Sequence, residues 1–300
     1  MRNQNHTNRR SLRSCILLFC LALSAGLFAL PAWATGTSLD LGIDTNYAFI
    51  DLGATTLGWN SGPIAGNVLF GQGLTAHLSG GNNGGITNGG VLYYDSTALI
   101  SGSLQNPVTK VLVPTSITNT ALTDAQNVSS YASSLPANQT FGAITGTKTI
   151  SGNAGLNVID VASIHNALLT LSGPANAIFV INVSGKFQTN KAMTLTGGIL
   201  ASNVLFNFTG TSGQVLSTSG GDKLYGTFLA TDGGQFQFSD LNLDGELINT
   251  DGKVQFVSGA KISDVTPFIA STPEPASMLL FGTGLLGIGF VMRKRLFVLS

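Results

Sequence analysis

Oxygen-bearing side chains alternate with leucines in residues 240–245, whose sequence is DLNLDG, and another carboxylate follows at residue 251. Oxygen ligands at every second position before a glycine are the spacing of calcium-binding loops. The candidate metal ligands are Asp240, Asn242, Asp244 and Asp251. The competing interpretation is a β-strand with its leucines turned inward. Because the flanking residues are typical of strands, we favour the strand and expect neither a metal nor a cofactor.

Carboxylates are also the main candidates for catalysis. Glycoside hydrolysis needs two facing carboxyl groups, and the densest acidic group is Asp232, Asp240, Glu246, Asp244 and Asp251. Between residues 35 and 272 there are two histidines far apart in sequence, no cysteine and no arginine. A thiol nucleophile and an arginine base are therefore absent from this part, and so is a Gly-x-Ser-x-Gly motif. We expect no enzyme, with a polysaccharide-active enzyme using aspartates as one alternative.

The N-terminus has the three parts of a secretory signal peptide. Four arginines precede an apolar run from Cys15 to Leu30, and Ala32 and Ala34 then form an Ala-x-Ala exit. Pro31 favours the extended chain that a peptidase needs. We expect residues 1–34 to form a signal helix that signal peptidase removes, leaving Thr35 as the first residue.

Residues 271–300 combine a Pro-Glu-Pro segment, an apolar run over residues 276–292 and a basic cluster, and we expect them to form a separate C-terminal tail. These signals are Pro273, Glu274, Pro275, Arg293, Lys294 and Arg295. A run of this length is close to what a transmembrane helix needs, and the basic cluster indicates a cytoplasmic end. The order resembles the PEP-CTERM sorting signal of Gram-negative bacteria. This resemblance implies recognition by exosortase, with a membrane-inserted intermediate before release.

The composition of residues 35–270 limits the number of charged groups on their surface. Only 9% of the chain is charged, whereas it contains 38 glycines. Between residues 35 and 272 there are seven Lys against twelve Asp and one Glu, so the net charge is 7 − 13 = −6. Such a mildly acidic surface excludes the electrostatic footprint of a nucleic-acid-binding protein.

Short alternating segments separated by Gly, Asn, Asp and Ser predict many short strands from about residue 37 to residue 268. The apolar centres Phe206, Phe228 and Leu247 lie about 20 residues apart, which is the length of one coil of a β-solenoid. One segment has helical spacing instead, with Ala121, Ala125 and Val128 on one face, and Pro136 ends it. We expect one helix over residues 120–136 alongside the strands, and a shorter one over residues 161–168.

The opening of this domain, with Leu41-Gly42 and Tyr47-Ala48-Phe49-Ile50 followed by residues 64–68 (IAGNV), resembles the β-helical ice-binding-protein-like family. Residues 177–185 (AIFVINVSG) and 203–208 (NVLFNF), followed by 226–230 and 244–248, resemble the related choice-of-anchor A domains. The resemblance implies a mainly β fold, a right-handed β-helix with one flanking α-helix.

Ice binding would require a regular array of threonines. Thr145, Thr147 and Thr149 alternate, as do Thr194 and Thr196, but no column repeats from coil to coil in the sequence. We therefore expect a structural or interaction protein of the cell surface or exopolysaccharide matrix, with exopolysaccharide as a candidate partner. An ice- or carbohydrate-binding module is the first alternative.

Overall fold

The computed structural model describes residues 38–106, 108–210, 213–220, 223–264 and 267–268. The signal segment and the whole sorting tail, including the expected transmembrane helix 276–292, lie outside these residues. Within the described part of the chain, no helix is long and apolar enough to cross a membrane.

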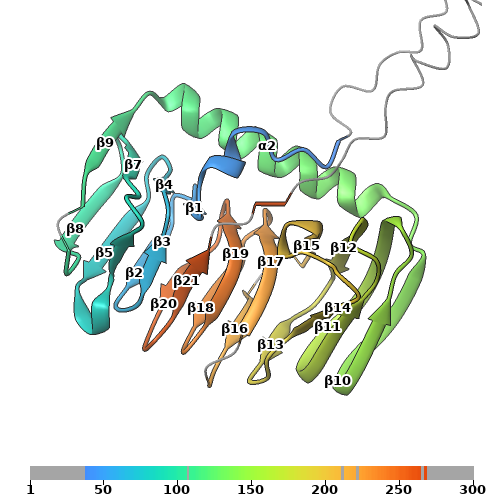
Figure 1. Cartoon of the computed structure of the whole chain (residues 1–300). Coiled ribbons are helices and arrows are strands. Elements are labelled where there is room, and N and C mark those ends of the chain that lie inside the picture. Colours follow the sequence, from blue (N-terminus) through green and yellow to red (C-terminus); the bar gives the residue numbers. More distant parts are fainter. Residues whose placement is uncertain (1–37, 107, 211–212, 221–222, 265–266, 269–300) are drawn as a thin grey trace, which may run out of the picture. The chain divides into compact units, whose positions relative to one another are not determined.

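Residues 38–268 form a parallel β-solenoid with three faces (Figure 1). Every strand pairing within the described residues is parallel, as stacked coils require. Face A contains β1 (Phe49–Asp51), β4 (Val68–Phe70), β7 (Leu92–Asp95), β9 (Lys110–Val113), β12 (Ala177–Val183), β15 (Val204–Phe208), β17 (Lys223–Ala230) and β19 (Asn242–Asn249). Face B contains β2 (Thr56–Trp59), β5 (Thr75–Ser79), β8 (Leu99–Ser103), β13 (Phe187–Thr189), β16 (Gly213–Thr218), β18 (Gly234–Phe238) and β20 (Val254–Phe256). Face C contains β3 (Pro63–Ala65), β6 (Gly85–Thr87), β14 (Thr194–Thr196) and β21 (Lys261–Asp264).

Two long strands, β10 (Gln139–Ser151) and β11 (Gly155–Ser172), bend around all three faces at one end of the stack. Three short 3-10 helices, η1 (Gly42–Asn46), η2 (Gly81–Asn83) and η3 (Ala201–Asn203), occupy connections between strands. The expected second helix over residues 161–168 is wrong, because these residues belong to β11. Its apparent helical spacing arises where β11 turns a corner at Asn166, whose φ is 49°.

The order of coils differs from the order of the chain. Along face A the strands run β10, β11, β12, β15, β17, β19, β1, β4, β7 and β9. The first strand, β1, therefore lies between β19 and β4, with Phe49 beside both Leu247 and Val68. Helix α2 (Thr115–Ser134) returns the chain from the β9 end to the β10 end along face A (Figure 1).

The core is a stack of inward side chains, several from each coil. Phe206 lies beside Phe228, and Phe228 beside Leu247, as the spacing of about 20 residues predicted. The rings of Phe206 and Phe228 are parallel, with centroids 4.7 Å apart. Burying such aromatic side chains dominates the energetics of a core, so the solenoid is held by this column more than by any charge.

Glycines form the corner between faces C and A in two adjacent strands. Gly226 and Gly245 are partners in the β17–β19 ladder and have φ values of 108° and 152°. A Cβ on Gly245 would lie 2.0 Å from the Gly226 carbonyl oxygen. The glycine of the DLNLDG segment is therefore needed for close packing of two backbones.

Helix α2 confirms the predicted amphipathic helix and begins five residues earlier, at Thr115. Its buried side chains are Thr118, Ala121, Ala125, Val128, Ser129 and Ala132. They pack with outward residues of face A, such as Ile50 and Leu205, in a second apolar cluster. The small alanine side chains let the helix approach the sheet closely.

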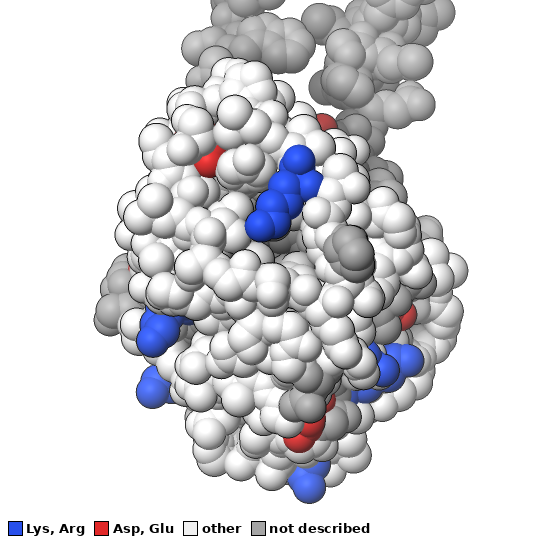
Figure 2. All heavy atoms as spheres, turned by 90° about the vertical axis from the view of Figure 1, so that its left-hand side faces the viewer, with Lys and Arg blue, Asp and Glu red and all other residues white. Residues whose placement is uncertain are grey.

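Each end of the solenoid carries a lysine on its last strand. Lys110 of β9 lies beside Leu92, and Lys148 of β10 beside Leu169, so both lysines share the side of the strand that faces the core. The Lys148 ammonium lies 4.1 Å from the centre of the Phe141 ring. Figure 2 faces the β8–β9 end, where charged side chains are sparse. Inward-directed charges of this kind discourage pairing between open sheet edges.

Candidate functional site: two polar faces and a groove beside the helix

Face B presents a continuous outward column of polar residues. Register places nine residues in line, one from each coil: Thr145, His165, Gln188, Ser217, Gln237, Gln255, Gly58, His77 and Ser101. With strands about 4.8 Å apart, the column is about 38 Å long. None of its residues is a Lys, Arg, Asp or Glu.

Neighbouring coils share hydrogen bonds on this face. His77 Nδ1 lies 2.8 Å from the hydroxyl of Ser101, and the Gln214 side-chain amide donates to the Gln237 side-chain oxygen. The inward residues between them, including Phe236 and Phe238, are buried. Apart from Gly58, the column on face B thus consists of exposed or partly exposed amide, hydroxyl and imidazole side chains without a formal charge.

Face C has two hydroxyl columns at the β10 end. Thr149, Thr170 and Thr194 form one, and Ser151, Ser172 and Thr196 form the next. The expectation that no threonine column repeats between coils is therefore wrong. The spacing within each column is 21 and then 24 residues, because the intervening turns differ in length. That unequal spacing hides the columns in the sequence.

The four candidate metal ligands do not converge. Asp240 lies in a turn at φ 56° before β19, whereas Asp251 follows the far end of that strand. The eight residues of β19 stand between them, and the strand turns the corner from face C to face A at Gly245, so the two aspartates lie on different parts of the coil. Asp240 and Asn242 instead line a hollow with Lys261. Within the described residues, no three His, Cys, Asp or Glu side chains are grouped as a metal site.

Two other aspartates of the acidic group do come together. Asp232 and Asp251 each stand two residues beyond the paired Ala230 and Asn249, so they occupy equivalent turns of adjacent coils. Both are exposed and line one hollow beside α2. Glu246 behaves differently, because it is fully buried.

Three hollows that share residues form a groove along α2. The first, of about 490 Å³, extends from Gln72 to Asp232, and the second, of about 420 Å³, begins at Gln126 and Asp232. The second shares Ser133 and Thr209 with a third, of about 340 Å³, which reaches Thr140. We call this feature the α2 groove. Its outer wall is the helix, and its inner wall is the row of turns from face A to face B.

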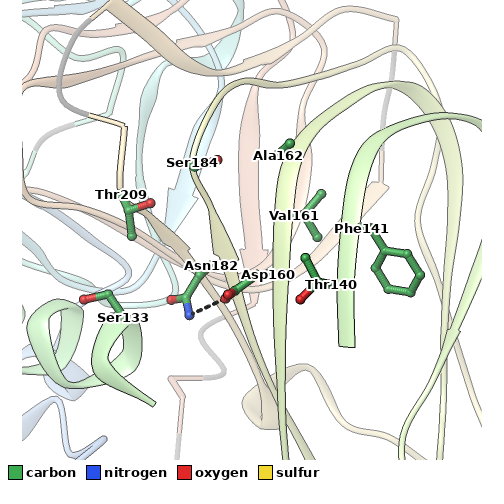
Figure 3. A pocket seen from close by; sticks show the side chains of 9 residues that line it. All are labelled: Ser133, Thr140, Phe141, Asp160, Val161, Ala162, Asn182, Ser184 and Thr209. Carbon is green, nitrogen blue, oxygen red and sulfur yellow. Dashed lines mark hydrogen bonds between the residues drawn. The ribbon is translucent and has the colours of Figure 1, made fainter. Parts of the chain in front are cut away.

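Figure 3 shows the third hollow. Asn182 and Asp160 point toward one another between the helix and β10, with Thr140 next to them, whereas Phe141 lies on the far side of its strand. The Asn182 amide donates to Asp160 at 3.2 Å and to the Ala132 carbonyl of α2 at 3.0 Å. This part of the groove therefore has a fixed polar floor.

The same network continues along the helix. Asn207 donates to the Ser129 carbonyl at 3.1 Å and to the Asn182 side-chain oxygen at 2.9 Å, and it accepts from the Ser129 hydroxyl at 2.7 Å. Thr231 donates to the Ser129 hydroxyl at 3.1 Å. Because buried amides must be satisfied, these bonds fix the position of α2 on the sheet. Sequence reasoning missed this network, although Asn182 and Asn207 each stand between two apolar residues near the end of a strand.

Three carboxyl groups are buried near η1 and in the centre of the stack. Burial raises the pKa of Asp44 to about 9, with further contributions from Glu246 and Asp124. Burial also raises the pKa of Asp51 and of Glu246 well above the usual range. The Thr227 hydroxyl donates to Glu246 at 3.1 Å. At all three positions burial favours the neutral acid over the carboxylate.

Two sequence families match the chain. The first, described as "Putative Ice-binding-like adhesive domain", matches residues 32–253. The chain belongs to this family. The second, the PEP-CTERM protein-sorting motif, matches residues 271–295. Together they mark the protein as an exported cell-surface protein, as the two terminal signals predicted. No curated protein matches the chain.

Solved structures with the same fold are ice-binding proteins. One from an Antarctic biological consortium is 22% identical with a TM-score of 0.51, covering 78% of this chain and 94% of that one. The protein from an Arctic yeast is 18% identical with a TM-score of 0.53, covering 80% and 98%. A domain from Shewanella frigidimarina is 16% identical with a TM-score of 0.53, covering 75% and 97%. At these identities the likeness establishes the β-helical fold alone, which confirms the predicted fold class.

Proposed function

We propose that this protein is a non-catalytic adhesive scaffold, cut by signal peptidase after Ala34 and processed by exosortase at its C-terminal signal. It then resides at the surface or in the exopolysaccharide matrix of a Gram-negative bacterium. The observation that carries the proposal is the pairing of a sorting motif with a domain of the ice-binding-like adhesive family. The uncharged column along face B supplies a large, flat contact surface, which suits adhesion better than turnover.

Replacing Pro273, Glu274 and Pro275 with alanines tests the processing step. A plain anchor needs only apolar length and flanking charge, so it tolerates this change. A protease signal does not, because the two prolines hold an extended segment in front of the membrane. We expect the variant to accumulate in the inner membrane about 3 kDa above the processed form (roughly 25 residues). Wild-type processing and location of the variant would refute exosortase handling.

The hydroxyl columns of face C favour ice binding as a second candidate function. Their six hydroxyls lie on adjacent coils at one end of the solenoid, and the neighbouring structures are described as ice-binding proteins. Thermal hysteresis of the exported protein tests this candidate. Hysteresis that Thr170→Val abolishes and Gln237→Ala leaves intact would support ice binding through face C. Absence of hysteresis would leave adhesion as the single candidate.

A further inference from the structure

We propose that the α2 groove binds one strand of a linear polysaccharide that carries no anionic groups. This inference rests on the adhesive function proposed above, since it assigns that function a ligand class and a site. The groove is distinct from the flat columns of faces B and C. It runs between α2 and the turns that connect face A to face B, on the face A side of those turns (Figure 3).

The groove has the length of a polymer site. Its inner wall crosses eight consecutive coils, from the turn at Gln72 after β4 to Thr140 of β10. At about 4.8 Å per coil, this is a path of about 34 Å. A small molecule would fill one of the three hollows and leave the others empty, whereas an extended chain occupies all three.

The lining selects the class of polymer. It consists mainly of hydroxyl and amide side chains together with Asp160, Asp232 and Asp251, and it contains no Lys, Arg or His. Three carboxylates without a cation repel nucleic acids and acidic glycans. A lipid chain would lie against hydroxyl, amide and carboxylate groups in each of the three hollows. An extended peptide would need an unpaired strand edge, whereas the strands at this groove are paired on both sides except at β10. A hydroxyl-rich glycan remains.

The groove is preorganised for such a chain. The bonds from Asn182 and Asn207 to the helix backbone hold its two walls at a fixed separation. Asp232 and Asp251 make no hydrogen bond or ion pair within the described part of the chain, and they stand on adjacent coils. They are thus free to accept from ligand hydroxyl or ammonium groups. We therefore expect a glycan bearing free amino groups to bind more tightly than a neutral one.

Affinity electrophoresis of the exported protein tests this proposal with three soluble probes. Hydroxyethylcellulose is neutral, glycol chitosan bears amino groups, and alginate is anionic. We expect retardation by the first two, strongest with glycol chitosan, and none by alginate. Ser130→Trp places a bulky ring in the groove from an exposed position of α2 and should weaken retardation at least about fivefold. Thr123→Trp, at an exposed position of the same helix that does not line the groove, should bind as wild type.

The carboxylates have their own variant. Asp232→Asn combined with Asp251→Asn should remove the preference for glycol chitosan and retain binding of hydroxyethylcellulose. Binding that survives Ser130→Trp but is lost in Gln237→Ala would place the ligand on face B and overturn the proposal. No retardation by any probe would also overturn it. Neither result affects the adhesive scaffold itself, which the processing variant of the sorting signal tests separately.

Discussion

Faces A and B use the same coils but give their outward polar residues opposite environments. On face A, Asn182 and Asn207 lie under α2 and are almost fully buried. On face B, Gln188 and Gln237 occupy equivalent outward positions and are exposed to solvent. A covered amide must find partners within the protein, and both asparagines do so through the helix backbone. An uncovered amide can bond to water or, like Gln237, to a neighbouring exposed side chain. Whether an outward amide helps to fix the position of α2 therefore depends on its burial beneath the helix, and not on its residue type alone.

The largest effect is expected for a substitution on face A, beneath α2. Asn207→Ala removes three hydrogen bonds and leaves the Ser129 hydroxyl and the Asn182 side-chain oxygen without that partner. We expect a loss of about 2–4 kcal/mol in the free energy of unfolding. Gln237→Ala on face B should change it by less than about 0.5 kcal/mol. Urea unfolding followed by circular dichroism measures both, and equal losses would show that the cover has no such role.

A medium effect concerns the buried acids on the covered side. Asp44 has a folded-state pKa of about 9 against an ordinary value of 3.8. Between these values the folded state binds more protons at Asp44 than the unfolded state, so the contribution of Asp44 to stability is highest below about pH 4 and falls as the pH rises toward 9. Asp44→Asn removes this contribution, whereas those of Asp51 and Glu246 remain, so the dependence on pH should become weaker. We expect it to raise the free energy of unfolding by about 1–3 kcal/mol at pH 8 and to have little effect at pH 4.

Thermal melts of wild type and variant across this pH range make the measurement. The matched control is Asp240→Asn, because Asp240 is exposed in its turn. It should leave the pH profile as in wild type. A variant at Asp44 with an unchanged slope would show that this carboxyl is not buried as a neutral acid.

The smallest expected effect is that of calcium. Strand β19 holds Asp240 and Asp251 at its two ends, so the four candidate ligands cannot surround one ion. Any ligand that binds the folded state raises its stability by mass action. We therefore expect millimolar calcium to leave the melting temperature unchanged within about 1 °C. If calcium raised the melting temperature by several degrees, and Asp244→Asn abolished that rise, the DLNLDG segment would be a calcium-binding site.

Much of the fold could be predicted from local patterns. Alternation identified the strands around Phe206 and Phe228, and helical spacing with Pro136 located α2. Both signals depend on residues within one element. The helix expected over residues 161–168 failed because a corner in β11 shifts the inward phase of the strand, and a short window cannot distinguish that shift from a helical period.

The sites were harder to predict, because they depend on register between coils. Thr149, Thr170 and Thr194 align only once the lengths of two different turns are known. The groove needs α2 in addition, since the helix forms one of its walls. The adjacency of Phe49 and Leu247 spans almost 200 residues and has no local signal. Sequence thus predicted the elements, and tertiary pairing determined the surfaces.

The positions of the first and last described residues within the stack have a mechanical consequence. Leu39, Leu41 and Phe268 pack in the same cluster beneath α2, and the Phe268 amide donates to Thr227 of β17 at 3.1 Å. Strand β17 lies in the interior of the stack, between β15 and β19. Tension applied through either end of residues 38–268 therefore enters at the centre of the solenoid, and the load divides between coils on both sides. The end coils are therefore not the first to be pulled away. Unfolding under tension requires several central strands to separate together.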